Sequence, residues 1–184
     1  MTQYRRGRTP GSCWFFTVNL HDRGSSLLTE QITSLRAAFR YTMQRHPFRI
    51  DAIVILPEHL HTVWTLPAGD ADFSCRWRLI KTMFSRTFSQ AESLSASGTS
   101  KGERGIWQRR YWEHRIRDAD DLARHVDYIH HNPRKHGLVE CVADWPWSSF
   151  HRYVAAGVLP LDWAGAGLVG LASHGMGERD GYRR

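Results

Sequence analysis

The segment that most constrains the fold is an apolar stretch at residues 48–66, interrupted in the middle by Pro57 and Glu58. Its first part, residues 48–56, contains the run AIVIL, and its second part, residues 60–66, is rich in β-branched and aromatic side chains. Runs of this length and composition, bounded by a proline, are typical of strands. Because the interruption is short, we expect the two strands to form a hairpin or to lie as close neighbours in one sheet.

Further strands and helices alternate on both sides of this pair. Residues 13–20 (CWFFTVNL) and 106–116 predict strands, whereas residues 29–44 and 70–88 carry apolar side chains at helical spacing. The resulting order, β-α-β-β-α-β, is that of the ferredoxin-like motif. The sequence therefore predicts an α+β fold in which an antiparallel sheet has helices on one face.

One more helix is expected after this motif, at residues 118–132. Asp118 can cap its first turn, and Pro133 is expected to follow its end. Its apolar stripe consists of Ala119, Leu122, Val126 and Ile129. The helix is thus an addition to the ferredoxin-like motif.

The length of 184 residues suits one domain with short extensions. We expect a flexible basic arm at residues 1–12, a single domain at residues 13–163 and a C-terminal tail at residues 164–184. Within the domain, the Ser- and Gly-rich residues 89–105 predict a mobile loop. The longest fully apolar run, residues 52–56, is far too short to span a membrane, and no signal peptide is recognisable. A cytoplasmic location without a membrane partner is therefore expected.

The formal net charge of +7 is compatible with an acidic polymer as partner and equally with an ordinary solvated surface. Cys13, Cys75 and Cys141 are widely separated and form no CxxC pair, which argues against a disulfide framework or a structural zinc site. No GxxxxGK[ST] loop is present, so no nucleotide cofactor is expected. The sequence GAGLVG at residues 165–170 fits GxGxxG, but it follows no clear strand and precedes no βαβ unit.

His59 and His61 are the first candidates for chemistry. Residues two apart on a strand share a face, and Leu60 between them then points to the opposite face, into the core. Two imidazoles on one strand face can hold a metal ion together. Histidines at this spacing also arise by chance, so a pair without a metal is the alternative at this point.

Tyr128 and Asn132 lie off the apolar stripe of the helix expected at residues 118–132. They are four residues apart and therefore project from one flank, which Asp121 and His125 share. This flank is available to face the histidine strand. The structural alternative is a half-buried tyrosine at the edge of the core and an asparagine that ends the helix.

The histidine pair and Tyr128 together suit phosphoryl transfer. A phenol is a poor nucleophile at neutral pH, because its ordinary pKa is about 10. A divalent ion on the scissile phosphate neutralises charge and orients the phosphorus for in-line attack, and mixed nitrogen and oxygen ligands suit Mg²⁺ or Mn²⁺. The product would be a 5′-phosphotyrosine and a free 3′-hydroxyl. Since the bond energy is kept, strands could be rejoined without a nucleotide cofactor.

Four stretches carry a resemblance to a known family: LPEHLHTVWTLP (56–67), GIWQRRYWEHRIRD (105–118), HVDYIHHNPRKHGLV (125–139) and DWPWSSFHRY (144–153). Together with the strand order, they make residues 13–163 resemble the REP-associated tyrosine transposases, a branch of the single-tyrosine HUH transposases. The run YIHHNPRKHG, combined with the HLH strand, is highly specific.

The resemblance implies a metal-dependent single-strand DNA endonuclease and transesterase. His59 and His61 would be metal ligands, Tyr128 the nucleophile, and Asn132 the third ligand, a place often taken by Gln in related transposases. The substrates would be REP palindromes, which are imperfect DNA hairpins, and the protein would act as a monomer in the nucleoid. Glu58 stands where Asn or Asp is expected at least as often, and it either reaches the metal or caps the bend.

Basic and aromatic residues together indicate how DNA would be bound. Trp107 and Tyr111 could stack on unpaired bases while arginines contact phosphates, with Trp112 expected to be buried. The alternatives are a strand whose tryptophans are core and whose arginines are solvated, and an N-terminal arm without fixed contacts. The candidate DNA-binding residues are Arg5, Arg6, Arg8, Arg109, Arg110, Arg115, Arg117, Arg134 and Lys135.

Two rival functions stay open. A module that binds DNA hairpins without catalysis would have no need for the histidines, the tyrosine and the asparagine. A metal-dependent nuclease without a covalent intermediate would use the histidines alone. A two-histidine phosphoesterase, however, needs paired HxT or HxS motifs, and this chain has none.

Overall fold

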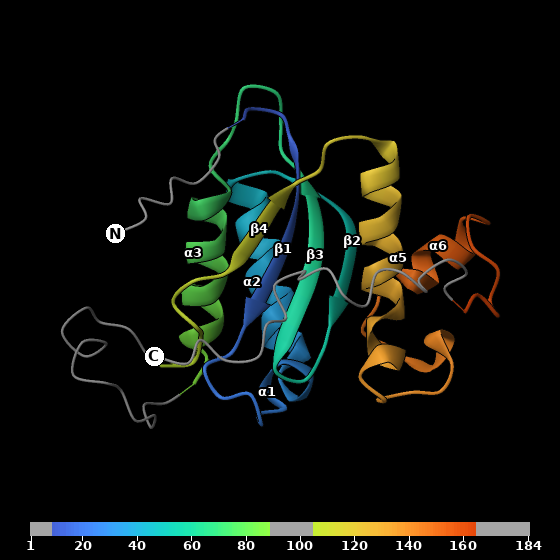
Figure 1. The fold of residues 1–184 in the computed structure, drawn as a ribbon. Coiled ribbons are helices and arrows are strands. Elements are labelled where there is room, and N and C mark those ends of the chain that lie inside the picture. The colour runs from blue at the N-terminus through green and yellow to red at the C-terminus, as the bar shows by residue number, and fades with distance from the viewer. Residues whose placement is uncertain (1–8, 89–104, 165–184) are drawn as a thin grey trace, which may run out of the picture.

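The computed structural model describes residues 9–88 and 105–164, and in this part of the chain four strands form one antiparallel sheet (Figure 1). In sheet order they are β2 (Arg49–Ile55), β3 (His59–Thr65), β1 (Cys13–Asn19) and β4 (Trp112–Arg115). The α+β class is confirmed, and the strand order agrees with a ferredoxin-like arrangement. The central strands β1 and β3 pair along their whole length.

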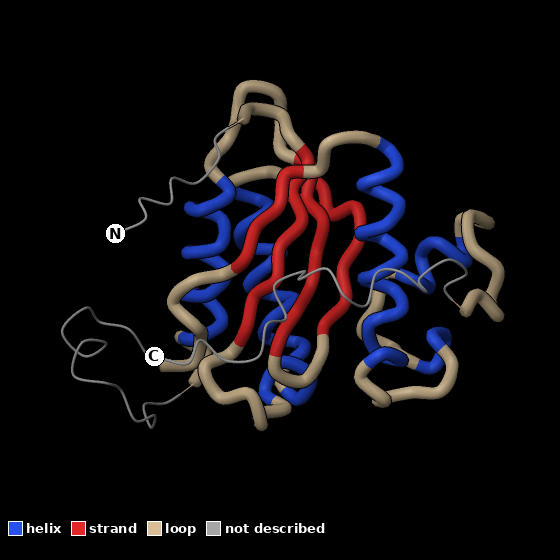
Figure 2. Tube along the Cα trace, viewed as in Figure 1, coloured by secondary structure: helices blue, strands red, loops and turns tan. Residues whose placement is uncertain are grey.

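Helices cover both faces of the sheet (Figure 2). One face carries α1 (Leu27–Glu30), α2 (Ile32–Arg45) and α3 (Phe73–Ser85). The opposite face carries α5 (Ala119–Lys135), which packs against β2 and β3. The chain continues into a short 3-10 helix, η1 (Val142–Asp144), and then α6 (Phe150–Ala155) beside α5. The additional helix therefore covers the second face of a sheet that was expected to have helices on one face.

Side chains that alternate along the strands separate two cores. The core under α2 and α3 is large and aromatic; its strand residues are Trp14, Phe16, Val18, Ile55, Leu60 and Trp64. The core under α5 is smaller; its residues are Phe15, Ala52, Val54, Leu56, Val63, Val126, Tyr128 and Ile129. The α5 face of the central strands also carries buried polar side chains, which the other face of these strands lacks apart from Thr62.

The helix expected at residues 29–44 is two helices, because α1 ends at Glu30 and α2 begins at Ile32. Leu28 is fully buried, and its N–H donates to the carbonyl of Pro57 at 3.0 Å. The short helix α1 is thus tied to the connection between β2 and β3. The apolar periodicity alone could not show this break.

The helix expected to end at Asn132 continues to Lys135, with Pro133 inside it. Asp118 caps the start as expected, since its side chain accepts from the Asp121 N–H at 2.7 Å. A proline near the end removes one hydrogen bond, and the following turn still forms, with the His136 N–H donating to the Asn132 carbonyl at 3.0 Å. Gly137, at φ +67°, then ends the helix in the left-handed conformation that glycine allows.

The strand expected at residues 106–116 is also shorter, because β4 covers only Trp112–Arg115 and Trp107 forms one isolated bridge with Leu20. Between them, the Gln108 carbonyl accepts from Lys81 Nζ at 2.9 Å, which directs this segment toward α3. Trp112 is only partly buried, contrary to expectation, and Glu113 is the buried residue of β4. Glu113 pairs with Phe16 and shares its face toward α2 and α3, whereas Trp112 packs against the core under α5.

Residues 1–8, 89–104 and 165–184 lie outside the described part, so the expected arm, loop and tail are described only where they meet the domain. There the Gly11 N–H donates to the Asp70 carbonyl at 3.0 Å. Among the described residues, no helix is long and apolar enough to cross a membrane. The division into arm, domain and tail stays a prediction.

Candidate active site on the α5 face

Strand β3 places His59 and His61 on the face of the sheet that α5 covers. Both side chains are buried, at 1% and 0% exposure, and their ring centroids lie 4.9 Å apart. Leu60 between them is fully buried in the opposite core, as the alternation along a strand predicts. β3 lies between β1 and β2, so hydrogen bonds on both edges hold the two imidazoles in place.

Each histidine has a polar partner at its Nδ1 atom. His61 Nδ1 lies 2.8 Å from the hydroxyl of Thr17, its direct partner across β1 and β3. His59 Nδ1 lies 2.8 Å from Glu58 Oε1, and Arg23 lies 3.5 Å from the same carboxylate oxygen. The tautomer in which Nδ1 carries the proton satisfies both contacts and leaves each Nε2 as the unprotonated atom.

Burial and hydrogen bonding determine the charge of this pair. Burial lowers the pKa of His59, against the opposing effect of Glu58, so the ring is neutral at neutral pH. Burial would raise the pKa of Glu58, but the hydrogen bond with His59 holds that pKa below its ordinary value. Among the described residues, His59 Nε2 is buried and has no hydrogen-bond partner. A neutral imidazole with such an atom fits a metal ligand whose orientation is fixed by a carboxylate.

Helix α5 brings Tyr128 over this pair. The tyrosine ring is 5% exposed, and its centroid lies 5.2 Å from that of His61 and 6.1 Å from that of Phe15. Asn132, one turn later, is fully buried on the same helix. Of the strand and helix residues expected to face one another, His61 and Tyr128 are therefore in contact.

The end of α5 adds Lys135, which was expected to bind phosphate near the nucleophile, and His136, to which the sequence assigned no role. Lys135 Nζ lies 3.5 Å from the Tyr128 hydroxyl, which it can reach as a donor, and 5.0 Å from the centre of the tyrosine ring. The His136 ring centroid lies 5.2 Å from that of His59. The spacing of seven residues between Tyr128 and Lys135, two turns of a helix, is the signal that could have indicated the first contact.

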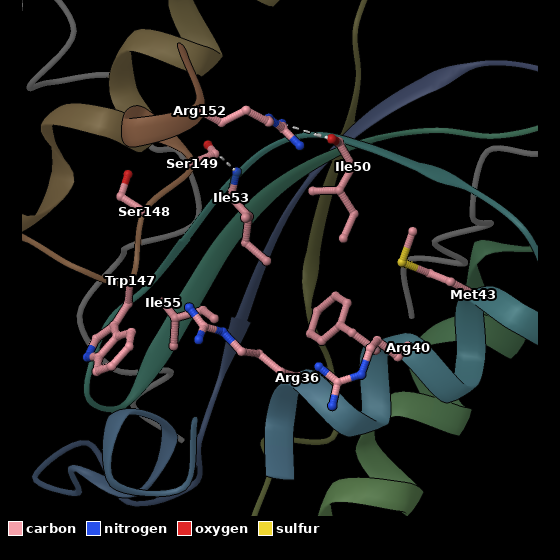
Figure 3. Close-up of a pocket in the computed structure, with 11 residues that line it drawn as sticks. Arg36, Arg40, Met43, Ile50, Ile53, Ile55, Trp147, Ser148, Ser149 and Arg152 are labelled. Atoms are coloured by element: carbon pink, nitrogen blue, oxygen red, sulfur yellow. Dashed lines mark hydrogen bonds between the residues drawn. The ribbon is translucent and has the colours of Figure 1, made fainter. Parts of the chain in front are cut away.

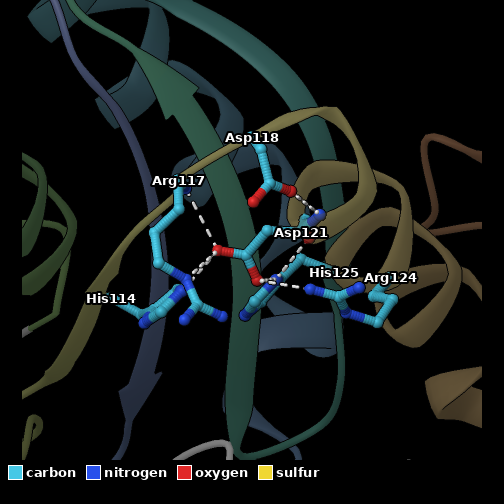
Figure 4. Close-up of polar contacts among 6 residues, drawn as sticks. All are labelled: His114, Arg117, Asp118, Asp121, Arg124 and His125. Atoms are coloured by element: carbon cyan, nitrogen blue, oxygen red, sulfur yellow. Dashed lines mark hydrogen bonds and ion pairs between the residues drawn. The ribbon is translucent and has the colours of Figure 1, made fainter.

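Near the start of α5, a second polar cluster surrounds Asp121 (Figure 4). Its carboxylate accepts from His114 Nε2 at 2.9 Å, from the N–H and the guanidinium of Arg117, and from Arg124 at 3.4 Å. Burial opposes ionisation of Asp121, but the hydrogen bonds from His114 and Arg117 hold its pKa well below the ordinary value. His125 Nδ1 lies 2.7 Å from the Asp121 carbonyl oxygen.

His114, Asp121 and His125 place three potential ligand atoms within 4.8 Å of one another, so this cluster could in principle hold a cation. Two guanidinium groups already neutralise the carboxylate, however, and both would repel a metal ion. The cluster is better explained as the polar contact that fixes α5 to β4. The histidine pair on β3, where His59 Nε2 is buried without a hydrogen-bond partner among the described residues, is the better candidate for a metal site.

The expected DNA-binding residues are dispersed. Arg5, Arg6 and Arg8 lie outside the described residues. Arg117 is exposed but is paired with Asp121, Arg134 approaches the Ala164 carbonyl at 3.5 Å, and Lys135 lies at the tyrosine. The others are exposed near β4; they are Arg109, Arg110 and Arg115.

A histidine pair on a central strand of an α+β sheet, faced by a tyrosine from a covering helix, is the arrangement that the resemblance to tyrosine transposases implies. No family model matches the sequence. A REP-associated tyrosine transposase of Escherichia coli (strain K12) is 51% identical over 165 residues, which cover 90% of this chain and 92% of the relative. A Haemophilus influenzae relative, provisionally given the same name, is 47% identical over 166 residues, covering 90% and 94%.

A solved structure described as a REP-associated tyrosine transposase bound to a REP hairpin superposes on this chain with a TM-score of 0.77. It is 51% identical in sequence and covers 89% of this chain and 92% of its own. The chain belongs to the family of REP-associated tyrosine transposases, which are enzymes. The resemblance inferred from four sequence stretches is confirmed.

Proposed function

We propose that this protein cleaves and rejoins single-stranded DNA at REP-type hairpins through a covalent link to Tyr128. The observation that carries the proposal is the contact between the Tyr128 ring and the metal-binding histidine candidate His61, at 5.2 Å between centroids. The choice of substrate is supported by the REP hairpin bound to the relative of similar fold and sequence. The DNA hairpin is thus the proposed partner, with the protein acting as a monomer.

The covalent step is a transesterification. The Tyr128 oxygen attacks the scissile phosphorus, a bond from phosphorus to the tyrosine oxygen forms, and the bond from phosphorus to the 3′-oxygen breaks. The phenol loses its proton and the departing 3′-oxygen gains one, so the products are a 5′-phosphotyrosine and a 3′-hydroxyl. Attack by a 3′-hydroxyl reverses the step and joins strands, which requires no nucleotide cofactor.

Lys135 supports this nucleophile in the proposal. Its ammonium lies 3.5 Å from the Tyr128 hydroxyl, so it favours negative charge on that oxygen and attracts the phosphate that approaches it. The lysine was expected to bind phosphate, and its place beside the nucleophile makes the scissile phosphate the candidate contact. Tyr128 is buried, so the neighbouring groups must move before DNA reaches it.

His59, His61 and Asn132 are the residues that would hold a divalent ion, Mg²⁺ or Mn²⁺. The fit rests on the neutral, buried His59, whose Nδ1 atom is engaged by Glu58. An ion bound there would neutralise charge on the scissile phosphate. In this proposal Glu58 does not contact the metal and does more than cap the bend. It holds Nδ1 of His59 and thereby orients Nε2 toward the ion.

The remaining basic residues would bind the DNA backbone. The arginines proposed for this role are Arg5, Arg6, Arg8, Arg109, Arg110, Arg115, Arg117 and Arg134. Arg117 would do so while it is also held by Asp121, since a guanidinium has several donors. Phosphate contacts of this kind position the DNA without reading its sequence.

The test is a transfer of label from DNA to protein. A labelled single-stranded REP hairpin is incubated with the protein and Mn²⁺ or Mg²⁺, and the mixture is separated on a denaturing protein gel. We expect labelled protein from the wild type and a loss of roughly 10³-fold or more for Tyr128→Phe. The matched control is Tyr111→Phe, which removes a hydroxyl that contacts Ser74 Oγ at 3.3 Å on the other face of the sheet.

Each other outcome selects a rival. Cleavage that persists in Tyr128→Phe would support a metal-dependent nuclease without a covalent intermediate. Tight binding of the hairpin by the wild type, with no cleavage in either metal, would support a DNA-binding protein without catalysis.

A further inference from the structure

A groove of about 310 Å³ lies at the outer edge of the sheet, between α2 and the chain leading into α6 (Figure 3). Its floor is formed by Ile50, Ile53 and Ile55 of the edge strand β2, and Phe39 and Met43 of α2 form an apolar wall. Phe39 and the isoleucines belong to the core under α2 and α3. The groove is therefore separate from the histidine and tyrosine site, which lies on the α5 face.

Three arginines surround this apolar floor. Arg36 and Arg40 are one helical turn apart on α2, and Arg152 reaches in from α6 on the opposite rim. None of the lining residues is acidic. The groove thus combines an apolar base with positive charge on two sides.

The aromatic wall of the groove is Trp147. Its carbonyl accepts from the Ile55 N–H at 2.9 Å, and two residues later the Ser149 N–H donates to the Ile53 carbonyl at 2.8 Å. The segment is therefore bonded along the edge of β2, which fixes the indole beside the groove. The Arg36 guanidinium lies 5.3 Å from the centre of the indole ring.

The guanidinium of Arg152 is also fixed in place. Its Nη2 atom donates to the carbonyls of Ile50, at 3.0 Å, and Asp51. A guanidinium has five N–H donors, so it can bind an anion in addition to these two carbonyls. On the rim opposite α2, the remaining N–H donors of Arg152 can therefore bind a phosphate.

We propose that this groove binds one nucleotide of the single-stranded DNA that flanks the hairpin, with the base against Trp147 and the isoleucine floor and its phosphates on Arg36, Arg40 and Arg152. Guanidinium groups match phosphate oxygens in geometry, and aromatic side chains stack on bases of any sequence. The volume is at the lower end of the range of small-ligand pockets, about 300–1,000 Å³, which suits a single nucleotide. In an acidic peptide the charged side chains, Asp and Glu, carry no ring that could stack on Trp147, whereas a nucleotide combines ring and phosphate in one unit.

This inference rests on the proposed function, because it assumes a hairpin substrate with a single-stranded flank. It adds a second contact with DNA on the other face of the sheet from Tyr128. A DNA strand bound both at Tyr128 and in the groove would be held on the protein beyond the phosphate that is cleaved. Its binding test needs no catalysis and no metal.

The experiment compares two REP hairpins, one without an extension and one with a four-nucleotide single-stranded extension on each end, by fluorescence anisotropy in EDTA. The variant Arg36→Gln with Arg40→Gln is expected to lose about tenfold or more in affinity for the extended hairpin, because two charged contacts with phosphate are lost together. Affinity for the hairpin without extensions is expected to stay unchanged. The slope of log affinity against log salt should fall by about 0.7 for each lost contact with a single-strand phosphate.

The matched control is Arg45→Gln with Arg78→Gln, which removes two charges from exposed parts of α2 and α3 outside the groove. Equal losses for both hairpins, or equal losses in the control variant, would overturn the proposal in favour of general charge attraction. A dimer that disappears in the groove variant would overturn it in favour of a second copy of the chain.

A second readout locates the base directly. Iodouracil placed in the extension and activated by light is expected to crosslink to Trp147, as identified by mass spectrometry, and Trp147→Phe should keep hairpin binding while shifting or losing this crosslink. A crosslink that maps only to the α5 face would overturn the proposal. The transfer of label from DNA to Tyr128 tests the proposed function, and the crosslink tests the groove. Failure of one proposal would therefore leave the other standing.

Discussion

On strand β3, Leu60 and Trp64 face α2 and α3, whereas His59 and His61 face α5. Trp64 is stacked on Trp77 at 4.3 Å between centroids and is surrounded by other aromatic rings. The histidines are equally buried, but their contacts are a hydroxyl, a carboxylate and the ring of a tyrosine. One strand therefore contributes side chains of opposite chemistry to its two faces.

The difference shows which face of the sheet stabilises the folded state and which face lowers its stability. Burial of aromatic side chains is favourable by itself, so stability alone explains the residues on the α2 and α3 face. Buried imidazoles, a buried asparagine and a buried phenol lose hydration and require partners, which makes them costly unless they serve another role. Sites of this kind are where the rules for stable packing are set aside for function.

The largest expected effect comes from the aromatic face. Trp64→Ala should lower the free energy of unfolding by about 3–5 kcal/mol, because it leaves a cavity among packed rings. His61→Ala on the other face should cost about 1–2 kcal/mol, the value of one buried hydrogen bond, while the transfer of label to protein is lost. Urea denaturation measures both, and the contrast between faces would be wrong if His61→Ala destabilised the protein as much as Trp64→Ala.

A smaller effect is expected from pH, through His130 on α5. Its ring is fully buried with Nε2 3.0 Å from Ser149 Oγ, and burial, followed by the charges of Arg152 and His151, lowers its pKa to about 4. The unfolded chain, with an ordinary histidine pKa, binds this proton first as the pH falls. The free energy of unfolding should therefore be highest above about pH 6.5 and decrease toward pH 4, by up to about 3 kcal/mol from this residue.

The contribution of His130 is isolated by comparison with His130→Gln, since glutamine keeps a donor toward Ser149 but does not titrate. Urea denaturation at several pH values should show a flatter profile for this variant between pH 4 and 6.5. Identical profiles for the two proteins would contradict the role of His130 and assign the pH dependence to other buried groups on the α5 face.

The smallest expected effect is on metal affinity and comes from Glu58, whose carboxylate contacts Nδ1 of His59. Glu58→Gln should weaken Mn²⁺ binding about 10- to 100-fold, because the amide polarises His59 less than the carboxylate does. Calorimetric titration with Mn²⁺ alone measures this without DNA. The matched control is Glu30→Gln, an exposed glutamate at the end of α1, which should leave the affinity unchanged. Equal affinities in wild type and Glu58→Gln would mean that Glu58 only stabilises the bend.

Much of this arrangement was predictable from local pattern. The strands expected at 13–20, 48–56 and 60–66 lie within one or two residues of β1, β2 and β3, because period-two alternation and a proline break are strong signals. The shared face of His59 and His61 follows from the same alternation. The shared flank of Tyr128 and Asn132 follows from helical spacing.

The rest depends on contacts between distant segments, which local pattern does not contain. Nothing in residues 118–132 states that their helix lies on the second face of the sheet. Nothing in residues 106–116 states that the pairing of this segment is interrupted between the Trp107 bridge and β4. Glu58 and His59 are neighbours in the sequence, but their side chains come within hydrogen-bond distance only because the chain bends after β2. The Lys135 contact with Tyr128 also required the helix to continue past Pro133, against the usual expectation.

That proline has a mechanical consequence. Because Pro133 has no N–H, the bond it would have made to the Ile129 carbonyl is missing, and the final turn of α5 is joined to the turn of Tyr128 by one hydrogen bond fewer. Asn132 and Lys135 lie on that final turn. The turn that holds Lys135 is therefore attached to the turn that holds Tyr128 by fewer backbone hydrogen bonds than in an uninterrupted helix, and less free energy is needed to separate the two turns.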